Sequence, residues 1–184
     1  MADSDRVGEF VGGLEHTPQA LTHLFTTLTP DMWHYHPQSE TGEKWSALDI
    51  LCHLCDEEKE DFGSRLKSLW IDPEKPWAPI DPAAWVKARN YAVQDPAQKL
   101  AEFKASREAS LKWLKSLDPH DVRWQNTYYH PKANLKAIDL LGAWAMHDIF
   151  HLRQLSHTIM SFISSPALPL MWAMPSLADK LTRC

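Results

Sequence analysis

The sequence predicts an all-α fold in which four helices form one bundle. Apolar residues recur at helical spacing in four separate segments, 14–28, 46–69, 95–117 and 135–164. Most of the prolines lie between these segments, where they interrupt no helix. No stretch shows a convincing strand pattern of alternating apolar and polar residues. We therefore predict a single bundle over residues 14–164.

The first helix is predicted from a start signal and the stripe behind it. Thr17 can serve as the N-cap and Pro18 as the first helical residue. Leu14 would extend the stripe backwards, so an earlier start with a bend at Pro18 is the alternative. Residues 1–13 are polar and contain glycine, and we expect a flexible lead-in there. The stripe consists of Leu21, Leu24, Phe25 and Leu28.

The second helix is predicted to begin at Ser46, with Asp49 three residues later as a variant of the capping box. At 100° per residue, His53 lies away from the centre of the apolar stripe, beside polar residues such as Glu57. Spacing alone therefore favours a solvent-exposed histidine over a ligand. The stripe itself comprises Leu51, Leu54, Cys55, Glu58, Phe62, Leu66 and Leu69.

Two further patterns that can bind metal are interpreted as structural. Cys52 and Cys55 form a CxxC in mid-helix, with no second CxxC and no preceding strand. We expect neither these two nor Cys184 to be needed for metal binding. His34 and His36 form an HxH in the polar loop 30–44, where surface histidines are the favoured interpretation.

The third helix is predicted to begin at Asp95-Pro96, with Gln98 completing the cap. Before it, residues 70–94 combine prolines with tryptophans and form a long irregular connection. Such a connection either serves a site or is a crossover pinned by its aromatic side chains. A second loop is expected over 118–134, and an irregular tail over 165–184.

The last helix carries His147 and His151, four residues apart, with Asn134 as its expected cap. Positions i and i+4 lie on one face, so both imidazoles can point at one metal ion. Ten histidines in 184 residues make a chance pair plausible. Two ligands rarely hold a catalytic ion, so a third must come from elsewhere. The pair shares its side of the helix with Leu140, Trp144, Leu155 and Thr158.

Composition limits the partners and the location. The net charge of −5 at pH 7 and the lack of a basic stripe argue against nucleic acid. No apolar run has membrane length, and the N-terminal residues do not resemble a secretory signal. Three cysteines, few and odd in number, indicate a reducing compartment. We therefore expect a cytoplasmic protein that acts on a small molecule.

The segments EKWSALDILCHLCDEE and AWAMHDIFHLRQLSHT, together with the tryptophan-rich crossover and the third helix, resemble the DinB-like (YfiT-like) metal-binding superfamily. The most specific parts are WSxxxILxHLxDxE and HDxxHxxQ, and the resemblance covers roughly residues 14–160. It implies a four-helix bundle with one long crossover connection. It also implies one divalent metal ion, zinc or nickel, held by His53, His147 and His151.

The resemblance further implies a function, since some members are transferases or isomerases that use a low-molecular-weight thiol as co-substrate. A thiol-using transferase with a pocket lined by Trp45 or Trp144 is the first expectation. A non-catalytic metal-binding or stress-associated protein is the second. A metal-assisted hydrolase is the third, because HDIFH is close to HExxH, although Asp148 is one methylene shorter than glutamate. No catalytic residue is assigned.

Carboxylates close to the proposed ligands have two possible roles. Asp56, Glu57 and Asp148 either orient the imidazoles or are ordinary surface charges.

A homodimer is also expected, as is common in proteins of this resemblance. Apolar residues lie on more sides of the last helix than one small core needs, namely Ile138, Ala145, Ile149 and Leu152. The alternative is that the C-terminal tail folds back over this face.

Overall fold

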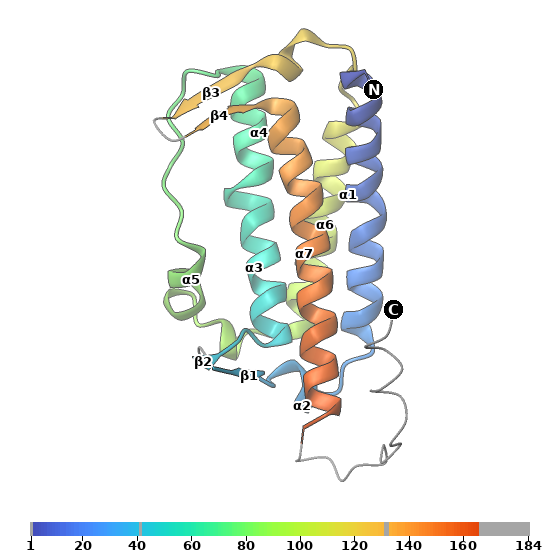
Figure 1. The fold of residues 1–184 in the computed structure, drawn as a ribbon, viewed down its shortest axis with the longest axis vertical. Helices are drawn as coiled ribbons and strands as arrows, with labels where there is room; N and C mark the ends of the chain where they lie inside the picture. The colour runs from blue at the N-terminus through green and yellow to red at the C-terminus, as the bar shows by residue number, and fades with distance from the viewer. Residues whose placement is uncertain (1, 41, 131–132, 166–184) are drawn as a thin grey trace.

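Four long helical segments run side by side in the computed structural model, which describes residues 2–40, 42–130 and 133–165 (Figure 1). They are α1 (Asp3–Thr26), α3 (Ala47–Glu60) continued by α4 (Phe62–Ile71), α6 (Pro96–Leu114) and α7 (Ala137–Ile163). Helix α1 packs against α6 and α7, and α3 packs against the same two helices. The predicted all-α four-helix bundle is therefore confirmed. No described helix is long and apolar enough to span a bilayer.

Helix α1 begins at Asp3, so the expectation of a flexible lead-in over 1–13 is wrong. Val7 and Leu14 are buried and continue the stripe of Leu21 and Phe25 towards the N-terminus. Packing against α7 stabilises a glycine-containing segment whose intrinsic helix propensity is low. Pro18 lies inside the helix. The predicted boundary between residues 13 and 14 thus falls in mid-helix, and the predicted tail beyond residue 165 lies outside the described residues.

The second helix has the predicted start but not the predicted continuity. The Ser46 hydroxyl accepts a hydrogen bond from the Asp49 backbone amide at 3.1 Å, and the Asp49 carboxylate accepts one from the Ser46 amide at 2.9 Å. Helical geometry then breaks at Asp61, whose φ of −115° and ψ of −99° separate α3 from α4. The apolar stripe continues across this break, so the sequence pattern does not reveal it.

Gly63, just after the break, lies in a close contact that a larger residue would disturb. A Cβ atom there would lie 2.8 Å from the Glu58 carbonyl oxygen and 3.4 Å from the Trp144 ring. We expect Gly63→Ala to lower the free energy of unfolding by about 1–3 kcal/mol, measured by urea denaturation. Gly12→Ala is the matched control, because nothing lies within 4 Å of its Cβ position. Equal stability of the two variants would refute this account.

Short elements connect the long helices. Two antiparallel hairpins pair β1 with β2 and β3 with β4. Neither was predicted, because strands of two to four residues are too short to show alternation. Asn134 lies in β4 and does not cap α7, whose N-cap is Lys136. The short elements are α2 (Pro30–Trp33), β1 (Gln38–Ser39), β2 (Gly42–Glu43), α5 (Pro82–Ala88), β3 (Thr127–His130), β4 (Ala133–Lys136) and the 3₁₀ helices η1 (Tyr91–Val93) and η2 (Val122–Gln125).

The crossover between α4 and α6 is held against α3 by polar contacts as well as by Trp85, which packs against a buried cluster that includes Leu48 and Cys52. The Tyr91 hydroxyl donates to Asp56 at 2.5 Å, and Arg89 forms ion pairs with Asp56 at 3.0 Å and Glu60 at 2.8 Å. Asn90, between them, adopts a left-handed conformation with φ 49°. The crossover therefore covers one side of α3, which becomes buried on more than one face.

Part of the apolar surface of α7 that was expected to form a dimer is buried by contacts within one chain. Ile138 and Ala145 are buried, and Ala145 lies 3.6 Å from the Cβ position of Gly13 in α1. Leu152 packs against the core. Ile149 stays half exposed, as do Met146 and other apolar residues of α7.

Candidate metal centre

Three histidines from two helices meet in the middle of the bundle. His53 of α3 and His147 and His151 of α7 each place a ring nitrogen within 4.8 Å of the others. The Nε2 atoms of His53 and His147 are 3.2 Å apart, and those of His151 and His147 are 3.1 Å apart. Two nitrogens bound to zinc at about 2.0–2.1 Å in tetrahedral geometry are separated by about 3.3 Å. The observed spacing therefore fits a shared metal ion.

His53 is only 4% exposed, so the sequence-based expectation of a solvated histidine is wrong. Every residue from Ala47 to Glu58 is buried, including those on the polar side of α3. Helix α3 packs against α6, α7, α5 and η1. Helix α3 is therefore buried on more than one face, and His53 lies on a buried face away from the main apolar stripe.

All three imidazoles are neutral at pH 7. Burial lowers the pKa of His53 to about 3, that of His147 to about 2 and that of His151 to about 4. The neighbouring histidines add to the depression for His53 and His147. Metal binding requires neutral imidazole, so no proton has to be displaced at neutral pH.

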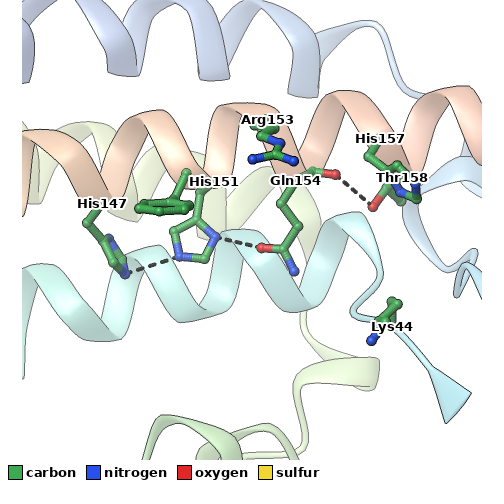
Figure 2. A pocket seen from close by; sticks show the side chains of 8 residues that line it. Lys44, His147, His151, Arg153, Gln154, His157 and Thr158 are labelled. Carbon is green, nitrogen blue, oxygen red and sulfur yellow. Dashed lines mark hydrogen bonds between the residues drawn. The ribbon is translucent and has the colours of Figure 1, made fainter. Parts of the chain in front are cut away.

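Hydrogen bonding orients at least one ring for binding. His151 Nδ1 lies 2.8 Å from Gln154 Oε1 (Figure 2). An amide oxygen can only accept, so Nδ1 carries the hydrogen and Nε2 presents its lone pair to the cluster. His53 Nδ1 is buried without a hydrogen-bond partner in the described chain, and the nearest carboxyl oxygen is Glu57 Oε1 at 3.6 Å.

Of the three carboxyl groups singled out from the sequence, only Glu57 faces a histidine of the cluster. Burial, followed by the hydrogen bond to Asp61 and its charge, raises the pKa of Glu57 to about 9. With Glu57 protonated and His53 neutral, their contact is not an ion pair. Asp56 is bonded to Tyr91 and Arg89, so its role is to anchor the crossover.

Asp148 belongs to a buried ionic network that sequence reasoning missed. Arg107 of α6 is 4% exposed and binds both Asp148 and Glu58 through its guanidinium. The same guanidinium donates to the Leu14 carbonyl at 3.1 Å, and Trp144 Nε1 donates to Glu58 at 3.1 Å. Burial raises the pKa of both Glu58 and Asp148, and Arg107 opposes that rise. The sequence did contain a sign of this network, because the charged residues Glu58 and Arg107 occupy positions in the apolar stripes of two helices that face each other.

Aromatic rings surround the histidines. Trp45 is parallel to His151 with centroids 6.4 Å apart, and it lies 4.9 Å from His53. A pocket lined by Trp45 or Trp144 was expected, but neither is among the residues that line the cleft beside the triad, and Trp144 is buried and donates a hydrogen bond to Glu58.

The remaining ligand-type residues lie outside the cluster. Cys52 and Cys55 are buried, and burial raises the pKa of the Cys52 thiol to about 12. His36 Nδ1 contacts the Lys44 carbonyl at 3.0 Å, and His34 is exposed. The only metal-type cluster among the described residues is the histidine triad. Cys184 lies outside the described part of the chain.

One side of the triad opens to a cleft of about 530 Å³. His147 and His151 line it together with residues of the next turns of α7, and Lys44 lies on the opposite side (Figure 2). A metal ion held by the triad would therefore be accessible to a small molecule.

Fold and site together define a four-helix bundle with a histidine triad beside a cleft that two of the histidines line. The family model of the DinB superfamily matches residues 13–155. The chain belongs to the DinB superfamily. A similar solved structure is YfiT from Bacillus subtilis, described as a probable metal-dependent hydrolase with an unusual four-helix bundle topology. The match has a TM-score of 0.76 and 19% identity, covering 88% of this chain and 90% of YfiT. A comparison with proteins of curated function found no match.

Proposed function

We propose that the protein binds one divalent metal ion, zinc or nickel, through His53, His147 and His151. The observation that carries this proposal is the approach of three neutral imidazoles, those of His53 and His151 buried and that of His147 partly exposed, with Nε2 separations of 3.1 and 3.2 Å. Neutral imidazole suits both zinc and nickel. In that arrangement His53 Nδ1 would carry the hydrogen, and Glu57 Oε1, at 3.6 Å, is the carboxyl oxygen near enough to accept it after a small movement.

We further propose that the protein is a metal-dependent transferase that uses a low-molecular-weight thiol. A divalent ion held by three imidazoles has a free coordination position, where it would act as a Lewis acid towards a thiol or water. The protein offers little help with deprotonation, because Asp148 is bound to Arg107 and Glu57 is protonated. Binding to the metal would lower the pKa of either ligand, and a free thiol, with a pKa of about 8.5 against about 15.7 for free water, starts closer to neutral pH.

A metal-dependent hydrolase is the second candidate, favoured by the description of YfiT. The HDIFH segment does not supply the base of an HExxH site, since the Asp148 carboxylate points into the ionic network with Arg107. A non-catalytic metal protein would be expected to have a closed site, and the cleft beside the triad favours an enzyme.

The test begins with metal analysis of purified protein and continues with thiol-transfer assays against a panel of electrophiles. We expect about one metal ion per chain and transfer that chelation abolishes and metal restores. Ester and amide hydrolysis, measured without thiol, separates the second candidate. Metal-dependent hydrolysis without thiol transfer would refute the transferase. Less than about 0.2 metal ions per chain after metal loading would refute the metal site.

The cysteines are expected to be dispensable for metal binding. A variant with Cys52, Cys55 and Cys184 all replaced by alanine should keep its metal stoichiometry, because the triad contains no sulfur ligand. Two small cavities in the core should cost at most about 1–2 kcal/mol of unfolding free energy. Metal analysis and urea denaturation measure the two effects. Loss of metal from a folded triple variant would contradict the assignment of ligands.

We also propose that two chains associate through the exposed apolar residues Met146 and Ile149 of α7, which are 52% and 50% exposed. Light scattering at tens of micromolar should report about twice the mass of one chain. Ile149→Glu should give a monomer, because it would bury a charge in the interface. Val93→Glu, at an exposed position on the crossover, is the control. A monomeric wild-type protein would refute the dimer.

A further inference from the structure

The cleft beside the histidine triad carries positive charge on an acidic protein. Arg153 and Lys44 line it, and no described lining residue has a carboxylate. The chain as a whole has a net charge of −5 at pH 7. A cleft whose charge is opposite to that of its protein favours ligands of the other sign.

Arg153 is exceptional among the arginines of the described chain, since it forms no ion pair with any described residue. The other five each have a carboxylate partner. A planar guanidinium with five donors is suited to carboxylate and phosphate groups. Arg153 therefore supplies donors to the cleft that the fold does not use. The paired arginines are Arg6, Arg65, Arg89, Arg107 and Arg123.

Two residues near Arg153 also line the cleft: Gln154 adds a polar group and Phe150 adds an apolar ring. Gln154 commits its amide oxygen to His151, and its NH₂ group has no hydrogen-bond partner in the described chain (Figure 2). That group can only donate, so it too suits an oxygen-rich ligand. Phe150 also lines the cleft and is 61% exposed, although its ring is apolar. It offers a surface to a hydrocarbon segment.

We propose that the cleft selects a small organic anion, with an apolar body that lies on Phe150 and an anionic group, carboxylate or phosphate, bound by Arg153, Lys44 and Gln154. This inference deepens the proposed function and rests on it, since it places the reacting end of the ligand at the triad. Arg153 follows His147 by six residues, which is about 9 Å of helical rise. A ligand with a chain of a few carbons spans that distance.

The test compares binding of adipate and its neutral diamide, adipamide, to zinc-loaded protein by calorimetry at low ionic strength. The two probes have the same carbon skeleton and differ in charge. We expect adipate to bind about fivefold tighter or more, with the preference shrinking at high salt. Pentyl phosphate, titrated in parallel, shows whether phosphate or carboxylate is preferred.

Lys44→Gln/Arg153→Gln should weaken the preference for adipate by about threefold or more, because both side-chain cations are removed while the zinc ion stays. Its zinc content and melting temperature should equal those of the wild type, since neither residue is in the triad or the core. Arg6→Gln, an exposed arginine near the start of α1, is the matched control and should keep the preference.

The outcomes separate this inference from the proposed metal function. Equal binding of adipate and adipamide, or no binding of either in the millimolar range, would overturn the anion-selective cleft while the metal content stands. A preference in the double variant equal to that of the wild type would also overturn it, because the metal alone would then account for the attraction of the carboxylate. Protein that takes up no zinc would refute the metal function, and the same titrations on metal-free protein would still decide whether the cleft prefers the anion.

Discussion

Replacing His147 with alanine is expected to remove most of the bound metal. His147 Nε2 lies between the Nε2 atoms of His53 and His151, at 3.2 and 3.1 Å. Without it two ligands are left, and two rarely hold a catalytic ion. Even loss of an outer-shell partner typically weakens metal binding by about 10–100-fold. We therefore expect at least about a hundredfold loss of affinity, measured by competition with a chelator.

The control for this variant is His157→Ala. His157 lies on the same helix and lines the same cleft, but it is exposed and outside the triad. It should leave metal affinity unchanged. His53→Ala and His151→Ala should each resemble His147→Ala. Undiminished metal in folded His147→Ala protein would show that the ion is bound elsewhere.

Replacing Arg107 with methionine is expected to cause the largest loss of stability. The guanidinium is the cation that Glu58 and Asp148 contact, and all three groups are buried. Removal of this guanidinium would leave the two buried carboxyl groups without their counterion and the Leu14 carbonyl without its hydrogen-bond donor. Breaking a buried ion pair from one side costs about 3–5 kcal/mol. For a domain of this size, that corresponds to a fall in melting temperature of roughly 6–20 °C.

Neutralising the carboxyl groups at the same time distinguishes lost charge pairing from lost packing. The triple variant Arg107→Met, Glu58→Gln, Asp148→Asn removes the uncompensated charge and should recover more than half of the lost stability. Lys112→Met, at an exposed position on the same helix, should change the unfolding free energy by less than about 0.5 kcal/mol. A loss below about 1 kcal/mol for Arg107→Met would refute this role.

Local signals in the sequence predicted the long helices well. The caps at Ser46 and Asp95 are correct because the side chain and the amide it binds are three residues apart. Leu14 indicated a start of α1 before Pro18, but the start at Asp3 was not predicted, because the first turns are stabilised by packing against α7 at the other end of the sequence. The break at Asp61 was missed because a kink does not interrupt an apolar stripe.

The candidate site was only half predictable from spacing. His147 and His151 are neighbours on one helix, and their spacing shows that. His53 was identified by resemblance to a family, and its periodicity pointed the wrong way, since α3 is buried on several faces. Arg153 could not be singled out, because its lack of an ion-pair partner depends on which carboxylates the fold brings near it.

The pairing of the first helix with the last determines when the protein can become complete during synthesis. Helix α1 packs against α7, and His53 is 94 residues before His147 in the chain. A ribosome releases α7 after every other helix of the bundle, so the surface of α1 that packs against α7 stays uncovered until then. Contacts between such distant segments slow folding relative to local ones. The triad consequently assembles only once α7 has been synthesised, and a metal ion that it binds would be captured at that last stage.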